Sequence, residues 1–244
     1  MSTPVTVLVL AAGLGTRMKS RRAKVLHRAG GLTLIEHVVN AAAAVAPPER
    51  IFVVVGHQAG HVKAALEGRP VRFVEQPEQK GTGDAVLACR EAAGPPDSLV
   101  VVLYGDCPLL TASTLGALVD RQRGSSAAAT MLTVTLDDPT GYGRIVRGSD
   151  GGVEAIVEQK AATPEQLAIR EVNSAIYCFR AGLLWKHIGE VRPDNPAREY
   201  YLTDVVALFR RAGHRVDAIR HADPQELGGI NTRVDLAAAD RVLR

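Results

Sequence analysis

The sequence predicts an α/β fold built on a Rossmann-like, doubly wound mixed sheet. Short, continuous apolar runs rich in β-branched residues occupy Val5–Leu10, Ile51–Val55 and 99–103, as expected for strands covered on both faces. Helical patterns separate these runs up to about residue 124, the order that right-handed strand-helix-strand crossovers require. Ligands of such folds bind at the carboxyl ends of the strands.

A helix is expected between the first two strands, and the Pro47-Pro48 pair should end it because proline cannot continue a helix. Further helices are expected to begin near Thr82 and Ser113. The apolar face of the first helix is formed, at helical spacing, by Ile35, Val38, Val39, Ala42, Ala43 and Ala46.

The second half departs from this alternation, because turn-rich segments rather than long helices separate its apolar runs. These runs should complete the sheet and add an inserted lobe. A helix is also expected at 202–212, where Gly213 can end it, and another after Asn231-Thr232. The strands expected here are 128–136, 152–158 and 174–179.

Composition indicates a soluble globular protein of 244 residues, 46% hydrophobic and 23% charged. No run approaches the roughly 18 apolar residues that cross a bilayer, so no membrane partner is expected. The net charge of +3 is too small to indicate nucleic acid as a partner. Three widely separated cysteines fit reduced thiols, and we expect a cytoplasmic location.

Positive charge is concentrated near the amino terminus. No acidic residue precedes Glu36, whereas basic residues crowd into 17–28. Such a local field suits a polyanionic ligand, although a solvated basic loop would have the same composition. The basic residues of this segment are Arg17, Lys19, Arg21, Arg22, Lys24 and Arg28.

The segment after the first strand is a candidate phosphate loop, because its small residues let the backbone approach a ligand and expose N–H groups. It departs from the dinucleotide fingerprint at Met18 and lacks the Gly-Lys-Ser/Thr ending of a Walker loop. Arg17 and Lys24 could instead flank a triphosphate held on backbone amides. A structural glycine turn with an exposed arginine remains the alternative.

Two oxygen-bearing side chains are candidate magnesium ligands. Asp106 follows the strand at 99–103 and should emerge at the carboxyl edge of the sheet. Asn231 lies in a glycine-containing turn before a helix. The alternatives are an Asx turn at Asp106 and a helix N-cap at Asn231. The segment 76–83 offers amide and backbone groups suited to recognising a base, or forms only a turn.

Taken in order along the chain, these segments resemble the uridyltransferase domain of bacterial N-acetylglucosamine-1-phosphate uridyltransferase, within the sugar-phosphate nucleotidyltransferases. The resemblance implies a nucleotide-diphospho-sugar transferase fold and covers nearly the whole chain. It is most specific at 137–144 and 199–204. The segments that carry it are 10–18, 24–27, 76–83, 103–106, 137–144, 156–158, 199–204 and 229–231.

The resemblance implies that UTP and N-acetylglucosamine 1-phosphate react to give UDP-N-acetylglucosamine and pyrophosphate, with Mg2+ as cofactor. Arg17 and Lys24 would be the catalytic residues on the phosphates, and Asp106 and Asn231 would bind the metal. The nucleotide would contact Leu10, Ala11, Ala12, Gly13, Gln76, Gly81 and Thr82. The sugar phosphate would contact Tyr104, Gly105, Tyr142, Gly143, Glu158, Asn173 and Tyr201.

The resemblance also sets expectations for organisation. We expect a single nucleotidyltransferase domain, 1–244, with a nucleotide-binding half at approximately 1–124 and a sugar-binding half at 125–244. The family's C-terminal β-helix of hexapeptide repeats is missing from the sequence, so acetyltransferase activity is expected to be absent and the chain to be a monomer. Ser174 and Pro196-Ala197-Arg198 depart from the family pattern and leave sugar selectivity open. A pyrophosphorylase of another sugar or base, or a non-catalytic nucleotide-binding regulator, are the alternatives.

Overall fold

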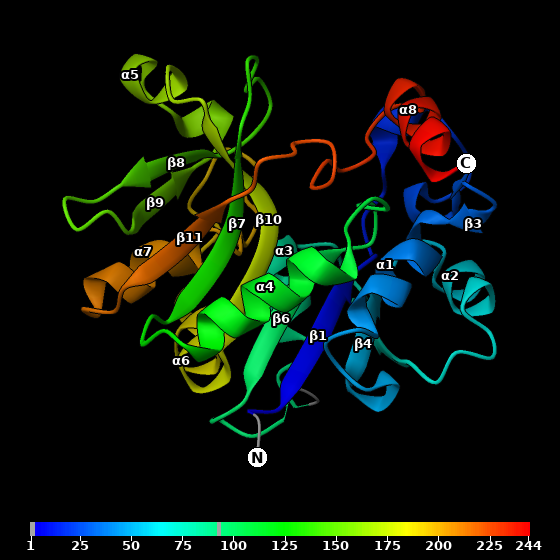
Figure 1. Cartoon of the computed structure of the whole chain (residues 1–244), viewed down its shortest axis with the longest axis horizontal. Coiled ribbons are helices and arrows are strands. Elements are labelled where there is room, and N and C mark those ends of the chain that lie inside the picture. The colour runs from blue at the N-terminus through cyan, green and yellow to red at the C-terminus, as the bar shows by residue number, and fades with distance from the viewer. Residues whose placement is uncertain (1–2, 92–93) are drawn as a thin grey trace.

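The computed structural model describes residues 3–91 and 94–244, and its centre is a mixed nine-stranded sheet. Seven strands lie in the order β11-β7-β10-β6-β1-β4-β5, and β8 and β9 extend the sheet from β10. Figure 1 shows this sheet crossing the molecule with helices on either side. The strands are β1 Val5–Leu10, β4 Ile51–Val55, β5 Arg72–Glu75, β6 Leu99–Tyr104, β7 Ala129–Thr135, β8 Arg144–Arg147, β9 Val153–Val157, β10 Glu171–Arg180 and β11 Val216–Arg220.

The three predicted core strands are confirmed as parallel neighbours. β1 lies between β4 and β6 and pairs with both in parallel register, and all residues of β1 and β4 are buried. β10 then pairs antiparallel with β6 and β7, which makes the sheet mixed, as predicted. The carboxyl ends of β1, β4 and β6 therefore meet at one edge, where the candidate loops begin.

Helices cover both faces of the sheet, because successive strand residues point to opposite sides. Val7 and Val9 pack in a core with α1, α2 and α4, whereas Leu8 and Leu10 pack in a second core with α3, α6 and α7. This three-layer arrangement is the predicted doubly wound fold. The helices are α1 Leu34–Ala42, α2 Ala59–Ala65, α3 Thr82–Leu87, α4 Ala112–Arg123, α5 Pro164–Leu167, α6 Ala181–His187, α7 Asp204–Arg211 and α8 Arg233–Leu243.

Helix boundaries follow local chemistry more closely than the apolar pattern. α1 begins at a capping box in which Thr33 and Glu36 satisfy each other's backbone N–H groups. It ends at Ala42, so the predicted extension through Ala46 was wrong. The residues before Pro47 form a turn instead, because a proline disfavours helical geometry in the residue that precedes it. α8 is capped by Thr232 and not by Asn231, which leaves the Asn231 amide available for other contacts.

Several short elements lie outside the sequence-based expectations, because their patterns are too brief to detect. A two-stranded hairpin, β2 and β3, follows the basic segment and contacts α8. The short elements are β2 Arg28–Ala29, β3 Leu32–Thr33 and the 3-10 turns Thr16–Met18, Lys24–Leu26, Pro48–Arg50, Gln159–Ala161 and Ile188–Glu190.

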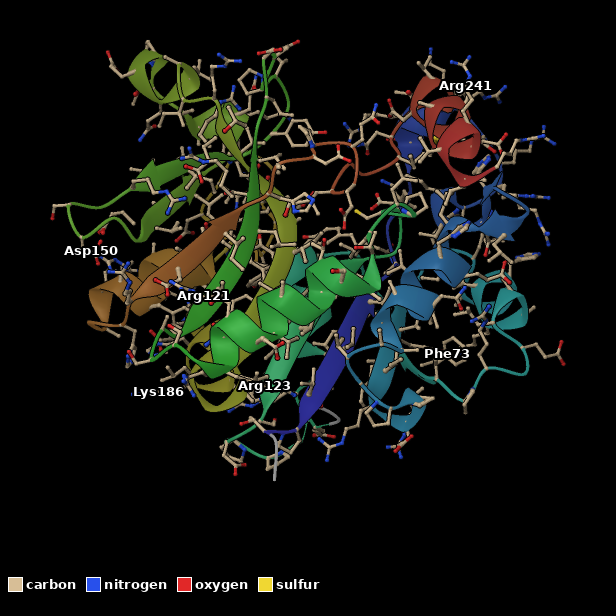
Figure 2. The ribbon with its side chains drawn as sticks, viewed as in Figure 1. Phe73, Arg121, Arg123, Asp150, Lys186 and Arg241 are labelled. Carbon is tan, nitrogen blue, oxygen red and sulfur yellow. The ribbon has the colours of Figure 1, made fainter. Side chains whose placement is uncertain are left out.

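A buried carboxylate fastens the predicted lobe to the sheet. Glu171 of β10 accepts hydrogen bonds from Thr133 of β7, Arg147 of β8 and Arg220 of β11. Its pKa is lowered because these hydrogen bonds outweigh the opposing effect of burial. Figure 2 labels Asp150, which lies in the turn between β8 and β9 and pairs with Arg210 of α7 at 2.9 Å. The β8-β9 hairpin is thus held near its turn from two sides, through Arg147 at the end of β8 and Asp150 in the turn.

The three cysteines are buried and free, as expected for reduced thiols. Within residues 3–91 and 94–244, no helix combines the length and the apolar character needed to span a bilayer.

The bulge in β10 carries a strained alanine and yields a stability prediction. Ala175 has φ 63°, a left-handed conformation that costs a residue with a Cβ about 1–2 kcal/mol. Ala175→Gly should therefore raise stability by up to about 1 kcal/mol after the entropy cost of glycine. Thermal denaturation measures the change, and a lower melting temperature in the variant would contradict the assignment of strain.

Candidate active site

Two adjoining cavities open at the carboxyl edge of the parallel strands. The loop cavity, of about 500 Å³, lies along the segment after β1. The lobe cavity, of about 620 Å³, lies between that edge and the β8-β9 lobe. Because they share wall residues, a group bound in one is adjacent to a group bound in the other. The shared residues are Arg17, Lys24, Thr82, Tyr104, Asp106 and Glu199.

Main-chain bonds to neighbouring strands hold the segment that follows β1. The Ala11 N–H donates to the Val54 carbonyl at 2.9 Å, and the Leu10 carbonyl accepts from the Gly105 N–H at 2.9 Å. A Cβ placed on Gly13 would meet no atom within 4 Å, so this stretch of backbone faces open space in the loop cavity. It is a fixed wall that a phosphate or a sugar ring can approach closely.

Gly15 brings the start of the loop against Lys24. Gly15 has φ 61°, and a Cβ there would lie 2.6 Å from the Lys24 Cβ. Only glycine permits both the left-handed backbone and this approach. Arg17 and Lys24, seven residues apart in the chain, consequently line both cavities.

Arg17, Lys24, Asp106 and Asn231 form a polar junction between the cavities. The Lys24 ammonium pairs with the Asp106 carboxylate and donates to the Asn231 Oδ1 at 3.1 Å. Arg17 donates to the same oxygen at 2.8 Å. The Ile230 N–H donates to the Asp106 carbonyl at 2.9 Å, which fixes the turn carrying Asn231 beside the end of β6.

The junction has the donors that a hard divalent cation prefers. One carboxylate oxygen and one amide oxygen converge on a single cation, the Lys24 ammonium. In the described part of the chain, no cluster of three or more His, Cys, Asp and Glu side chains could hold a metal. Asp106 and Asn231 could therefore hold Mg2+ only with phosphate oxygens and water as its other ligands, which is its usual manner of binding.

Gln76 has its amide orientation fixed by a carboxylate. Its Nε2 donates to the Gly81 carbonyl at 3.1 Å and to the Asp84 Oδ2 at 2.7 Å. An ionised carboxylate only accepts, so the nitrogen must face Asp84 and the Gln76 Oε1 is left as an acceptor. Gln76 lines the loop cavity and is 3% exposed, so this acceptor is held in one orientation.

Hydrogen bonds join the segment carrying Gly81 and Thr82 to the loop that precedes α7. The Gly83 N–H donates to the Tyr200 carbonyl at 2.7 Å, and the Thr82 hydroxyl accepts from the Leu202 N–H at 3.0 Å. A Cβ on Gly81 would lie 2.5 Å from the Tyr200 carbonyl oxygen, so glycine is required. These contacts place Glu199 in the wall of both cavities and Tyr201 in the wall of the lobe cavity, and bring both halves of the chain to the site.

A half-buried carboxylate, Glu158, lines the lobe cavity. Burial raises the pKa of Glu158, and the negative charge of Asp204 raises it further, against a hydrogen bond from Thr203. Gly143 packs against Glu158, since a Cβ there would lie 3.3 Å from its Oε1. This carboxylate can accept hydrogen bonds from hydroxyl or amide groups of a bound polar molecule.

Asn173 is held by the bulge in β10. Its Oδ1 accepts from the Ala175 N–H at 2.9 Å, and its Nδ2 donates to the Tyr177 hydroxyl at 2.7 Å. The Asn173 N–H donates to the Gly143 carbonyl at 2.9 Å. The left-handed backbone at Ala175 therefore serves to place a polar side chain in the cavity wall.

Most of the predicted nucleotide and sugar residues separate between the two cavities, but Thr82 and Tyr104 line both. Gly105 lines neither, because its Cα faces the core and a Cβ there would lie 2.8 Å from Ile35. The loop cavity alone holds Leu10, Ala11, Ala12, Gly13, Gln76 and Gly81, and the lobe cavity alone holds Tyr142, Gly143, Glu158, Asn173 and Tyr201.

Sequence reasoning did not identify three residues that shape the site. Asp84 orients Gln76, and Thr203 donates to Glu158 at 3.5 Å. Glu199 lines both cavities. Asp84 lies in the first turn of the helix predicted to begin near Thr82, but nothing in its spacing indicates that it faces Gln76. Glu199 and Thr203 fall in the segment 199–204, in which the resemblance implied an individual role for Tyr201 alone.

Comparisons with known proteins identify the family of the chain. The family model of the MobA-like NTP transferase domain matches residues 7–169. A bifunctional protein GlmU from Solibacter usitatus is 57% identical over 244 residues, which cover 100% of this chain and 52% of that protein. A bifunctional protein GlmU from Koribacter versatilis is 47% identical over 241 residues, covering 98% and 51%. The chain spans about half the length of these curated relatives, and the resemblance found in its motifs is confirmed.

Solved structures share the fold. A crystal structure described as a glucose-1-phosphate thymidylyltransferase from Bacillus anthracis superposes with a TM-score of 0.74 at 19% identity, covering 98% of this chain and 95% of that one. A nucleotidyl transferase from Methanothermobacter gives 0.68 at 21% identity, covering 99% and 98%. At these identities the likeness concerns the fold alone, and it confirms the predicted class.

The raised pKa of Glu158 predicts that this carboxylate lowers the stability of the fold at neutral pH. At neutral pH the ionised Glu158 carboxylate destabilises the fold, so Glu158→Gln should raise the melting temperature. The gain should shrink as the pH falls below the raised pKa of the folded state toward about 4.3, the ordinary pKa of glutamate, and should vanish only where the carboxyl is protonated in the folded and unfolded states alike. Thermal denaturation of both proteins between about pH 7.5 and 4.5 measures this, and a gain independent of pH would contradict it.

Proposed function

The chain belongs to the MobA-like NTP transferase family, and from this premise we propose that it transfers uridylyl from UTP to N-acetylglucosamine 1-phosphate, giving UDP-N-acetylglucosamine and pyrophosphate. The observation that carries the proposal is the pair of cavities that share Arg17, Lys24 and Asp106. A nucleotide in one cavity and a sugar phosphate in the other would bring their phosphates to the same cations.

The loop cavity suits the nucleoside triphosphate. The backbone of Leu10 to Gly13 would lie against the nucleoside, and Thr82 and Gly81 would form the opposite wall. The Gln76 Oε1, fixed as an acceptor, would receive a hydrogen bond from the N3–H of uracil. Cytosine has an acceptor at that position, so the same geometry would disfavour CTP.

The polar junction suits the phosphates. Arg17 and Lys24 would neutralise charge on the triphosphate and stabilise the charge that develops as pyrophosphate leaves. Asp106 and Asn231 would hold Mg2+, which supplies further charge neutralisation on the phosphate oxygens. Lys24 pairs with Asp106, so each of these charges has a partner of opposite sign within the protein.

The lobe cavity suits the amino-sugar phosphate. Glu158 and Asn173 present an acceptor and an amide to hydroxyl and acetamido groups, and Tyr142 and Tyr201 form apolar walls with polar edges. With the sugar in this cavity, its phosphate oxygen would face the α-phosphorus across the junction. Proximity and alignment would then supply most of the rate enhancement, without a covalent intermediate on the protein.

The proposal assigns the two halves of the chain different tasks. Residues 1–124 would supply most of the nucleotide site, and 125–244 most of the sugar site, with Asn231 returning to the junction. A monomer carries both cavities within the described residues, which supports function without a partner chain. The buried free thiols fit a reducing compartment, which supports a cytoplasmic location.

Pyrophosphate release tests the proposal. The protein should release pyrophosphate from UTP with N-acetylglucosamine 1-phosphate and Mg2+, and Asp106→Ala should lose at least about a hundredfold of that turnover. Other triphosphates, glucose 1-phosphate and glucosamine 1-phosphate serve as competitors. Turnover confined to another pair would replace the proposed substrates, and nucleotide binding without any turnover would favour a regulator.

Base selection gives a second test. Asp84→Ala removes the carboxylate that orients Gln76, so its amide can turn and present a donor to cytosine. The preference for UTP over CTP, measured as the ratio of kcat/KM, should fall about tenfold. Asp120→Ala, which alters an exposed ion pair on α4, is the matched control. An unchanged preference in Asp84→Ala would refute the role of Gln76 in base selection.

A further inference from the structure

The turn after β4 contains a non-glycine residue in a left-handed conformation. Gln58 has φ 56° and ψ 36° and immediately precedes α2. Such a conformation costs a residue with a Cβ about 1–3 kcal/mol and persists where surrounding contacts require it. The turn itself could use glycine at no such cost, so the glutamine side chain is the part that needs explanation.

The Gln58 side chain pairs with the backbone of the basic segment. Its Oε1 accepts from the Ala23 N–H at 2.9 Å, and its Nε2 donates to the Arg21 carbonyl at 2.5 Å. The amide oxygen accepts from the backbone and the amide nitrogen donates to it, so the side chain makes the same pair of hydrogen bonds that the backbone of an adjacent β-strand would make. Gln58 and Ala23 are 35 positions apart in the sequence. Figure 1 shows β4 and α2 on the same side of the molecule as the basic segment.

The segment held in this way carries Lys24. Ala23 is the N-cap of the 3-10 turn Lys24–Leu26, and its own side chain makes no capping hydrogen bond. On the opposite side, Gly15 packs against the Lys24 Cβ. The same β4 turn also contacts the loop after β1, because the His57 N–H donates to the Ala12 carbonyl at 3.3 Å. One short turn therefore braces both segments that flank the loop cavity.

We propose that Gln58 is a positioning residue that acts through Lys24, by fixing the backbone from which the lysine reaches the phosphates. Gln58 lines neither cavity and so has no contact with substrate of its own. The proposal rests on the proposed function for its kinetic consequence, whereas the pairing with Ala23 stands independently of it.

Gln58→Gly is the informative variant, because glycine keeps the left-handed backbone without strain while the side chain that carries the amide is removed. We expect kcat to fall roughly five- to fiftyfold, while KM for the sugar phosphate stays within about twofold. Gln58→Ala should lose as much activity and be less stable. Gln166→Ala is the matched control, since that glutamine bonds to the Thr163 backbone at α5 and should leave kcat unchanged.

A double-mutant cycle separates positioning from a general structural role. In a Lys24→Ala background, Gln58→Gly should cost less than about twofold in kcat, because the residue through which it acts is gone. Full additivity of the two losses would overturn the proposal. Wild-type kcat in Gln58→Gly alone would overturn it as well.

Amide hydrogen exchange provides a readout that does not depend on activity. The Ala23 N–H should be protected in the wild type and should exchange at least about tenfold faster in Gln58→Gly. Equal protection in both proteins would refute the pairing. If the wild type instead shows this protection but releases no pyrophosphate with any substrate pair, the proposed function fails and the kinetic part of this inference fails with it.

Discussion

The meeting of Lys24 with Asp106 and Asn231 is the interaction on which the rest of the site depends. Asp106 is 8% exposed, and a carboxylate withdrawn from water to that extent needs a cation or several hydrogen-bond donors. Lys24 supplies that cation, and Arg17 joins it on the Asn231 oxygen. The polar junction thus gathers positive charge and hard oxygen donors where Arg17, Lys24 and Asp106 line both cavities, which is what the proposed reaction between two phosphates requires.

The fold makes this meeting possible through close backbone contacts. Gly15 lets the loop approach Lys24, and the Ile230 N–H fastens the Asn231 turn to the end of β6. Gly81 lets Tyr200 close over the α3 segment. The contacts of Ile230 with Asp106 and of Gly81 with Tyr200 join parts of the chain that are distant in sequence. The rigid parallel strands beneath, buried on both faces, keep these contacts in register.

The sequence predicted what local patterns encode. Continuous apolar strands indicated the parallel centre of the sheet, and β1 and β4 have the predicted bounds. The division of site residues between nucleotide and sugar came from the resemblance and stays a prediction, although most of the two sets line different cavities. Gly105 lines neither cavity, and the sequence could not predict this, because a position at a strand end does not tell which way its Cα faces. The pairings of Gln58 with Ala23 and of Asp84 with Gln76 were not predictable, since no periodicity relates these residues and only the folded chain brings them together.

The central claim is that two substrates in adjoining cavities react directly across the polar junction. The stereochemical course at the α-phosphorus tests it most directly, using UTP made chiral there with sulfur and an oxygen isotope. A single in-line displacement by the sugar phosphate inverts that centre, and the account predicts inversion. Net retention would mean that the nucleotidyl group passes through a covalent bond to the protein, which would contradict the account.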